Sequence, residues 1–188
     1  PEDDGAASPA FAAFRDELRG IVARRDTAAL LALVAPGARL SFGDEPGGPE
    51  GFRQMWFSGM PPEGTGAVWD VLGRILEQGS VEEDGVFMVP FVYGLWPSDV
   101  DPFSHVAVVG ENVPAHAEPS GDAPVVARLS HLIVPVLAPP RDGWWAVQLP
   151  SEEAAYVRAE HAHSAVGYRA GFWPEGDSFR LQFLIAGD

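Results

Sequence analysis

The residues best suited to binding a metal lie close together in the chain, as Glu160, His161 and His163. Side chains two positions apart on a strand point to the same face, so the two imidazoles would face one way. Zinc accepts histidine and carboxylate ligands, which fits this pattern. A zinc site needs more ligands than this stretch supplies, and the sequence names no further one. We therefore expect solvated histidines, no metal site and no cofactor.

Nucleophilic catalysis would need a serine or another nucleophile next to a base. The chain contains two adjacent serine–histidine pairs, Ser104-His105 and Ser130-His131. Neighbours on a strand point to opposite faces, so neither pair is expected to act as nucleophile and base. No serine stands in the Gly-x-Ser-x-Gly turn typical of hydrolases. The interpretation that we prefer is polar residues at strand edges.

The remaining sequence patterns that could carry chemistry supply no catalytic group either. Acidic residues run together at 82–84 and 152–153, beside turns, where such runs are usually solvated. Gly47-Gly48 is not followed by the lysine of a phosphate-binding loop. We predict no catalytic residues, and hence a protein that is not an enzyme.

Composition excludes two classes of partner. The net charge of −15, with only 12 basic residues, opposes binding to nucleic acid. No apolar run reaches the roughly 18 residues of a transmembrane helix, so we expect no membrane insertion. The absence of cysteine excludes disulfides and thiolate metal sites. The chain opens on a polar stretch without an initiator methionine, from which we expect a removed leader and a periplasmic or secreted protein.

The first half of the chain predicts helices after a disordered linker over residues 1–8. Ser8-Pro9 caps the first helix, in which apolar residues recur at helical spacing. The further predicted elements are helices over 27–34, from 49 onward and over 67–78, and a short strand over 38–42.

The second half predicts strands. Residues 86–96 are apolar and β-branched or aromatic, although Pro90 disfavours a central strand. A terminal hairpin, Tyr168–Ile185, alternates apolar residues on both arms around a Pro-Glu-Gly-Asp turn. Two strands alone are marginal in water, so we expect the hairpin to pack on the N-terminal helices. The strands predicted between these two segments are 105–109, 124–129, 133–137, 144–149 and 155–158.

These middle strands carry a series of short motifs. They are Asn112-Val113, Pro119-Ser120, Pro124-Val125-Val126 with Leu129, Val134 with Val136-Leu137, Gly143-Trp144-Trp145-Ala146-Val147 and Ala155-Tyr156-Val157. The series resembles the bacterial SH3-like domain family, which implies a small β-barrel of short strands and tight turns. The order of elements in the flanks is similar to nuclear transport factor 2-like folds, which implies no activity.

The predicted fold class is therefore α+β: N-terminal helices with a small sheet, an SH3-like β-barrel, and a C-terminal β-hairpin returning to the N-terminal part. The predicted domains are an α+β domain over 9–104 plus 164–188 and a barrel over 105–163. In the SH3-like family, rings at such positions often meet a peptide or glycan ligand, which makes Trp144, Trp145 and Tyr156 the candidate ligand-binding residues.

The function that we predict is non-enzymatic: an extracytoplasmic bacterial module that recognises a peptide, a cell-wall fragment or a protein partner. Trp144 and Trp145 are neighbours on a strand, so one should face the core and the other the outside. The alternative is a small-molecule or hydrolytic pocket in the flanking domain, for which Trp56, Trp69, Phe91 and Tyr93 are the residues to consider.

Overall fold

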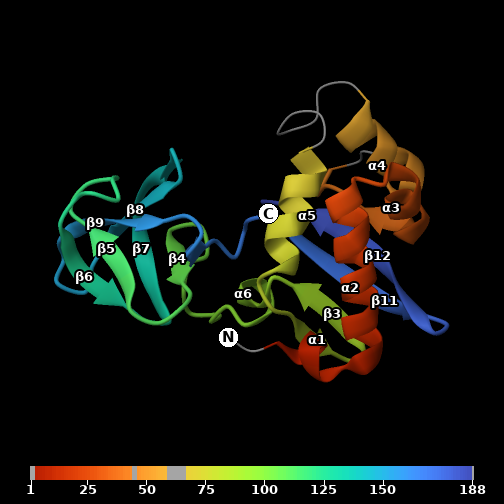
Figure 1. Ribbon diagram of the computed structural model, residues 1–188, viewed down its shortest axis with the longest axis horizontal. Coiled ribbons are helices and arrows are strands. Elements are labelled where there is room, and N and C mark those ends of the chain that lie inside the picture. Colours follow the sequence, from red (N-terminus) through yellow and green to blue (C-terminus); the bar gives the residue numbers. More distant parts are fainter. Residues whose placement is uncertain (1–2, 44–45, 59–66, 188) are drawn as a thin grey trace. The chain divides into compact units, whose positions relative to one another are not determined.

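The computed structural model describes residues 3–43, 46–58 and 67–187. All six helices of the described residues, and two separate sheets, make the protein α+β, as predicted. The chain forms two compact units (Figure 1).

One unit, the α+β unit, comprises residues 3–95 and 167–187, and the other, the β-rich unit, comprises residues 96–166. The β-rich unit is thus inserted into the chain of the α+β unit. The predicted boundaries, at 105 and 163, lie nine and three residues inside those of the β-rich unit.

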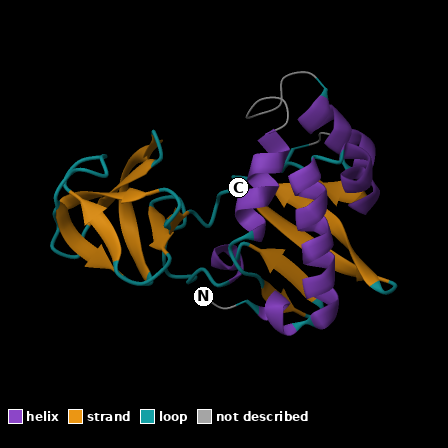
Figure 2. Ribbon diagram, in the orientation of Figure 1, coloured by secondary structure: helices purple, strands orange, loops and turns teal. Residues whose placement is uncertain are grey.

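The α+β unit has a five-stranded sheet of order β1-β12-β11-β3-β2, in which only β1 and β12 are parallel. Its strands are β1 (Val34–Arg39), β2 (Val81–Glu83), β3 (Val86–Val89), β11 (Arg169–Glu175) and β12 (Ser178–Ile185). Its helices are α1 (Asp4–Ala7), α2 (Pro9–Arg24), α3 (Thr27–Leu33), α4 (Gly48–Phe57), α5 (Ala67–Leu76) and α6 (Phe91–Gly94). The long helices α2 and α5 lie across one face of the sheet (Figure 2).

Local signals set the ends of the first helices. The Ser8 side chain accepts a hydrogen bond from the Phe11 amide at the start of α2, and Asp26 caps α3 through the Ala29 amide. Between them, Arg25 has φ 52°, the left-handed conformation that ends many helices. These caps explain why the sequence locates the start of both helices.

The core of the α+β unit is built around Phe11 of α2, which is completely buried. Its ring stacks on Phe87 of β3 at 4.0 Å between centroids and meets the edge of Phe179 of β12 at 5.2 Å. Phe172 of β11 lies 5.7 Å away. The terminal hairpin therefore packs on the N-terminal helix, as predicted.

The expectation of a disordered linker over residues 1–8 is wrong for residues 3–8, which are docked on the sheet. Asp3 accepts hydrogen bonds from Arg15 at 2.7 Å and from the Ser80 hydroxyl at 2.9 Å. The Asp4 amide donates to the Ser80 carbonyl, beside β2. Partners so distant in sequence leave no local signal, because only tertiary folding brings them together.

Two predicted strands differ from the observed ones. The strand predicted over 38–42 is shifted to β1 (Val34–Arg39), because Val34 and Ala35 enter the core directly after α3 and pair with β12. The apolar stretch 86–96 is strand only up to Val89. Pro90 follows, and the short helix α6 replaces the second half of the predicted strand.

The β-rich unit is a seven-stranded sheet of order β10-β4-β7-β8-β9-β5-β6. Its strands are β4 (His105–Val108), β5 (Val113–His116), β6 (Val125–Leu129), β7 (Leu132–Arg141), β8 (Trp144–Gln148), β9 (Ala154–Arg158) and β10 (Ala162–His163). Within residues 96–166, all of which are described, no pairing joins β6 back to β10. The sheet is therefore open, and a closed SH3-like barrel stays a prediction.

All seven strands nevertheless share one hydrophobic core. Its buried members include Val106 of β4, Val113 of β5, Leu129 of β6, Val147 of β8 and Ala162 of β10. A flat sheet could not bring its first and last strands to the same cluster. The sheet therefore curls around its own core.

Candidate functional site

Strands β8 and β9 set the orientation of the candidate ligand-binding residues. Residues directly opposite each other in an antiparallel pair share a face. Trp145 lies opposite Val157, which is completely buried, and packs partly buried against the core. Trp144 lies opposite Arg158 on the other, outward face. The two tryptophans thus face opposite ways, as the alternation of a strand predicts.

Although Trp144 faces outward, only 5% of it is exposed. The Arg158 guanidinium lies over the indole, 4.4 Å from the ring centroid, in a cation–π contact. The His116 ring of β5 meets the indole edge-on at 5.3 Å between centroids. The indole is therefore a platform for a cation and not itself an open contact surface.

His116 is buried and its hydrogen bond fixes its tautomer. Its Nδ1 lies 2.9 Å from the carbonyl oxygen of Ala123, which can only accept, so Nδ1 carries the proton and donates. The bond ties the loop between β5 and β6 to the platform. Gly121 of this loop lies beside Arg158, since a Cβ on Gly121 would stand 3.3 Å from the Nη2 atom.

A row of side chains crosses the outward face from β6 to β7. Cross-strand partners follow one another as Val125, His116, Tyr156, Ala146 and Ala138. Tyr156 is half-buried at the centre of this row. The two alanines have small side chains, which leave space above the sheet beside the Tyr156 ring. We call these five residues the outer row.

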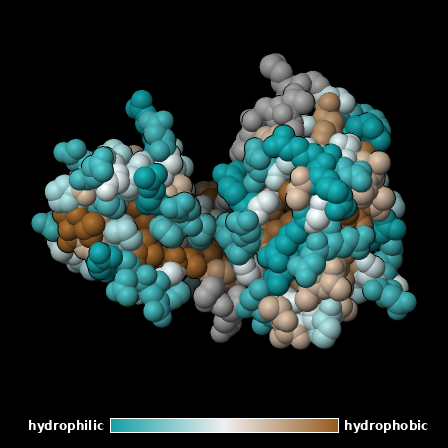
Figure 3. Space-filling model, viewed as in Figure 1, coloured by the Kyte–Doolittle hydropathy of each residue, from teal (hydrophilic) through white to brown (hydrophobic). Residues whose placement is uncertain are grey.

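Exposed apolar side chains lie on the strands at the two ends of the outer row. Val125 and Val126 of β6 are 45% and 49% exposed, and Leu137 of β7 is exposed as well. In Figure 3, hydrophobic atoms gather over β6 and β7 among hydrophilic ones. The outward face of the β-rich unit thus presents apolar area, the aromatic ring of Tyr156 and the cation of Arg158.

The serine–histidine pair at 104–105 departs from its predicted geometry. Ser104 precedes β4 and lies in a turn, where strand alternation does not apply, and its Oγ lies 3.0 Å from His105 Nδ1. The same Oγ donates to the Asp101 carboxylate at 2.6 Å, and His105 Nδ1 contacts the Asp101 carbonyl oxygen at 3.0 Å.

This geometry does not activate the serine. His105 Nδ1 must carry a proton to bond a carbonyl, so it cannot accept the serine proton. The hydrogen bonds from Ser104 and from the Phe103 amide lower the pKa of Asp101, which makes this carboxylate a weaker base. The pair therefore caps a turn.

Of the two histidines considered as metal ligands, one lies in a strand. Ala162 and His163 form β10, which pairs with β4, while His161 comes just before it. The pKa of His163 is lowered to about 4 because burial disfavours its charged form and His161 adds repulsion. Among the described residues, no group of three potential ligands could hold a metal ion.

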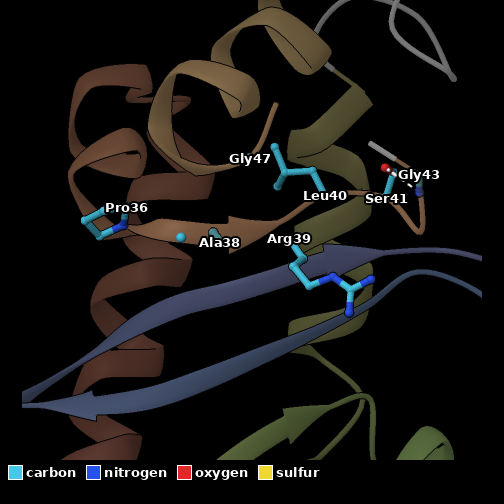
Figure 4. Close-up of a pocket in the computed structure, with 8 residues that line it drawn as sticks. Pro36, Ala38, Arg39, Leu40, Ser41, Gly43 and Gly47 are labelled. Carbon is cyan, nitrogen blue, oxygen red and sulfur yellow. Dashed lines mark hydrogen bonds between the residues drawn. The ribbon is translucent and has the colours of Figure 1, made fainter. Parts of the chain in front are cut away.

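A shallow groove of about 310 Å³ lies beside β1 in the α+β unit (Figure 4). It is lined by Pro36, Gly37, Ala38, Arg39, Leu40, Ser41, Gly43 and Gly47. The Arg39 side chain extends from β1 over the hairpin strands. Trp56 and Trp69 are buried in the core instead, and Tyr93 contacts Phe183. None of the aromatic residues that the sequence offered for a pocket is among those that line the groove.

Sequence reasoning missed Arg158 and His116 as parts of the site. Arg158 could have been found, because it stands two positions after Tyr156 on the same strand and so shares its face. His116 gave no such signal. It reaches Trp144 only because β5 pairs with β9.

No helix among the described residues has the length and hydrophobicity to span a membrane. Comparison with protein-family models, with curated proteins and with solved structures found no match.

Proposed function

We propose that the protein is a non-enzymatic binding module whose β-rich unit is SH3-like and recognises an extended peptide segment, in a cell-wall fragment or in a protein partner. The observation that carries the proposal is the outer row with the Trp144–Arg158 platform next to it. Ring, apolar and cationic groups together are what peptide-binding surfaces use.

The outer row has the length of a short peptide. Its accessible part, from Tyr156 on β9 to Ala138 on β7, spans about 10 Å at about 4.8 Å per strand, which matches about three residues of extended chain. Tyr156 offers a half-buried ring that loses little conformational entropy on binding. Its alanine neighbours leave room for the ligand backbone to approach the sheet.

The SH3-like part of the proposal is supported by the position of the strands. The motifs that resemble the family fall on β5 to β9, and the glycine of Gly143-Trp144 has φ 81° in the tight turn between β7 and β8. The curled sheet around one core is the arrangement that a small barrel requires.

Co-sedimentation of the full chain with insoluble peptidoglycan tests the proposal. We expect the wild type to pellet and Tyr156→Ser to stay in solution, because the central ring of the outer row is lost. Trp173→Ala is the matched control, since Trp173 is a partly exposed ring of the α+β unit.

Two results would contradict the proposal. Equal loss of binding in both folded variants would place the contact outside the outer row. A wild type that neither pellets nor shows NMR shift changes at the outer row with soluble peptides would refute the peptide-binding function itself.

A further inference from the structure

We propose that Arg158 binds the terminal carboxylate of the ligand, so that the β-rich unit is selective for peptides with a free C-terminus. This inference rests on the proposed function, and it specifies which group of the ligand the same surface binds. It follows from the charges of the unit, from the position of Arg158 and from the loop beside it.

The charge on Arg158 is not neutralised by another residue. Residues 96–166 contain three arginines, no lysine and an excess of acidic residues. Arg141 pairs with Asp142 at 3.3 Å, and Arg128 donates to the Asn112 carbonyl at 3.0 Å.

Within the described chain, by contrast, the Arg158 side chain has no ion pair and no hydrogen bond. Glu118 and Asp122, on the loop beside it, are exposed and do not pair with it. The Arg158 guanidinium is therefore available to pair with an anionic group of a ligand.

The platform holds this cation over the Trp144 ring, 4.4 Å from its centroid. The guanidinium is planar and presents its N–H groups as a rigid fork. The side chain as a whole is exposed. A carboxylate matches this fork with two parallel hydrogen bonds, which neither an amide nor a hydroxyl can do.

The loop between β5 and β6 favours the end of a chain over its middle. Gly121 lies against the Nη2 side of Arg158, and the bond from His116 to Ala123 holds the loop there. One side of the guanidinium is therefore closed. A peptide that runs from β7 towards β9 along the outer row would meet this loop at β9, with its last carboxylate at Arg158.

The test is a titration of the ¹⁵N-labelled full chain with acetyl-Ala-Lys-Ala-Ala, as the free acid and as the C-terminal amide. The small side chains suit the outer row, and the lysine suits an acidic protein. We expect the free acid to bind about tenfold more tightly, the range for a charge-assisted hydrogen-bonded pair at a partly exposed site. The Nε–H signal of Arg158 should shift with the acid alone.

Variants separate the guanidinium from general charge effects. Arg158→Gln should bind both peptides as weakly as the wild type binds the amide, which also shows that the variant is folded. Arg158→Lys should recover only part of the preference, because an ammonium lacks the planar fork. Arg141→Gln, which removes the same charge from the same unit, should keep the tenfold preference.

Equal binding of acid and amide would overturn the inference and leave the proposed peptide binding in place. An equal loss in Arg141→Gln and Arg158→Gln would overturn it too, since net charge would then be the cause. An amidated peptide with an internal aspartate that binds as tightly as the free acid would refute selectivity for a chain end. No binding of either peptide would refute the inference and the proposed function together.

Discussion

Acidification should destabilise the β-rich unit through His163. This side chain lies on β10, the two-residue strand that holds the end of the unit against β4. Burial, and to a smaller extent the charge of His161, lower its pKa to about 4. The folded protein thus keeps the imidazole neutral over a range of pH in which the unfolded chain takes up a proton.

The magnitude follows from the difference between the two states. A histidine in an unfolded chain has a pKa of about 6.5. Above that value the imidazole is neutral in both states and His163 adds no pH dependence. Between about pH 6.5 and 4 only the unfolded state is protonated, so the free energy of unfolding falls by about 1.4 kcal/mol per pH unit. With the folded pKa at about 4, the loss amounts to about 3 kcal/mol.

The assay is urea unfolding at about pH 7, 5.5 and 4, followed through amide NMR signals of the β-rich unit. Wild type and His163→Gln share every carboxylate, so the difference between them isolates this imidazole. His131→Asn is the control, because His131 is exposed and its φ of 46° suits asparagine. We expect this control to follow the wild type at each pH.

Two results would refute the reasoning. Wild type and His163→Gln could lose stability in parallel, or the His163 imidazole could titrate above about pH 6 in the folded protein. Either result would mean that burial does not hold the imidazole neutral.

Three further predictions concern the α+β unit and are checked by urea unfolding. Phe11→Ala should cost about 3–5 kcal/mol, because it empties a completely buried site in contact with several rings. Gly171→Ala should cost about 1–3 kcal/mol, since its Cβ would stand 2.2 Å from the Phe183 ring; an unchanged midpoint would show that the ring moves freely. Asp3→Asn should cost about 1–3 kcal/mol at neutral pH. Burial raises the pKa of Asp3, but hydrogen bonds with Arg15 and Ser80 outweigh this and lower it. The wild type should therefore lose its advantage as pH falls through the lowered pKa, and a difference that persists in acid would contradict this cause.

Much of the fold could be predicted because its signals are local. Helix α2 is marked by its cap at Ser8 and by the spacing of its apolar residues, and the terminal hairpin by alternation on both arms. The N-terminal docking through Asp3 could not be predicted, since its partner Ser80 lies far along the chain. The helix α6 was missed because Phe91, Val92 and Tyr93 are aromatic or β-branched, a composition typical of a strand.

For the candidate site, the composition of the surface and the face to which each strand side chain points follow from the sequence alone. Alternation along β8 placed Trp144 and Trp145 on opposite faces, because successive side chains of a strand always diverge. The acidic surface and the scarcity of cations are likewise properties of the residues alone.

The groups that cover Trp144 depend on the tertiary structure. The register of β9 sets Arg158 opposite the indole, and the pairing of β5 with β9 brings His116 to its edge. Register is fixed by how the strands fill a common core, which depends on residues throughout the unit. For that reason the aromatic residues could be named from the sequence, whereas the cation that they carry could not.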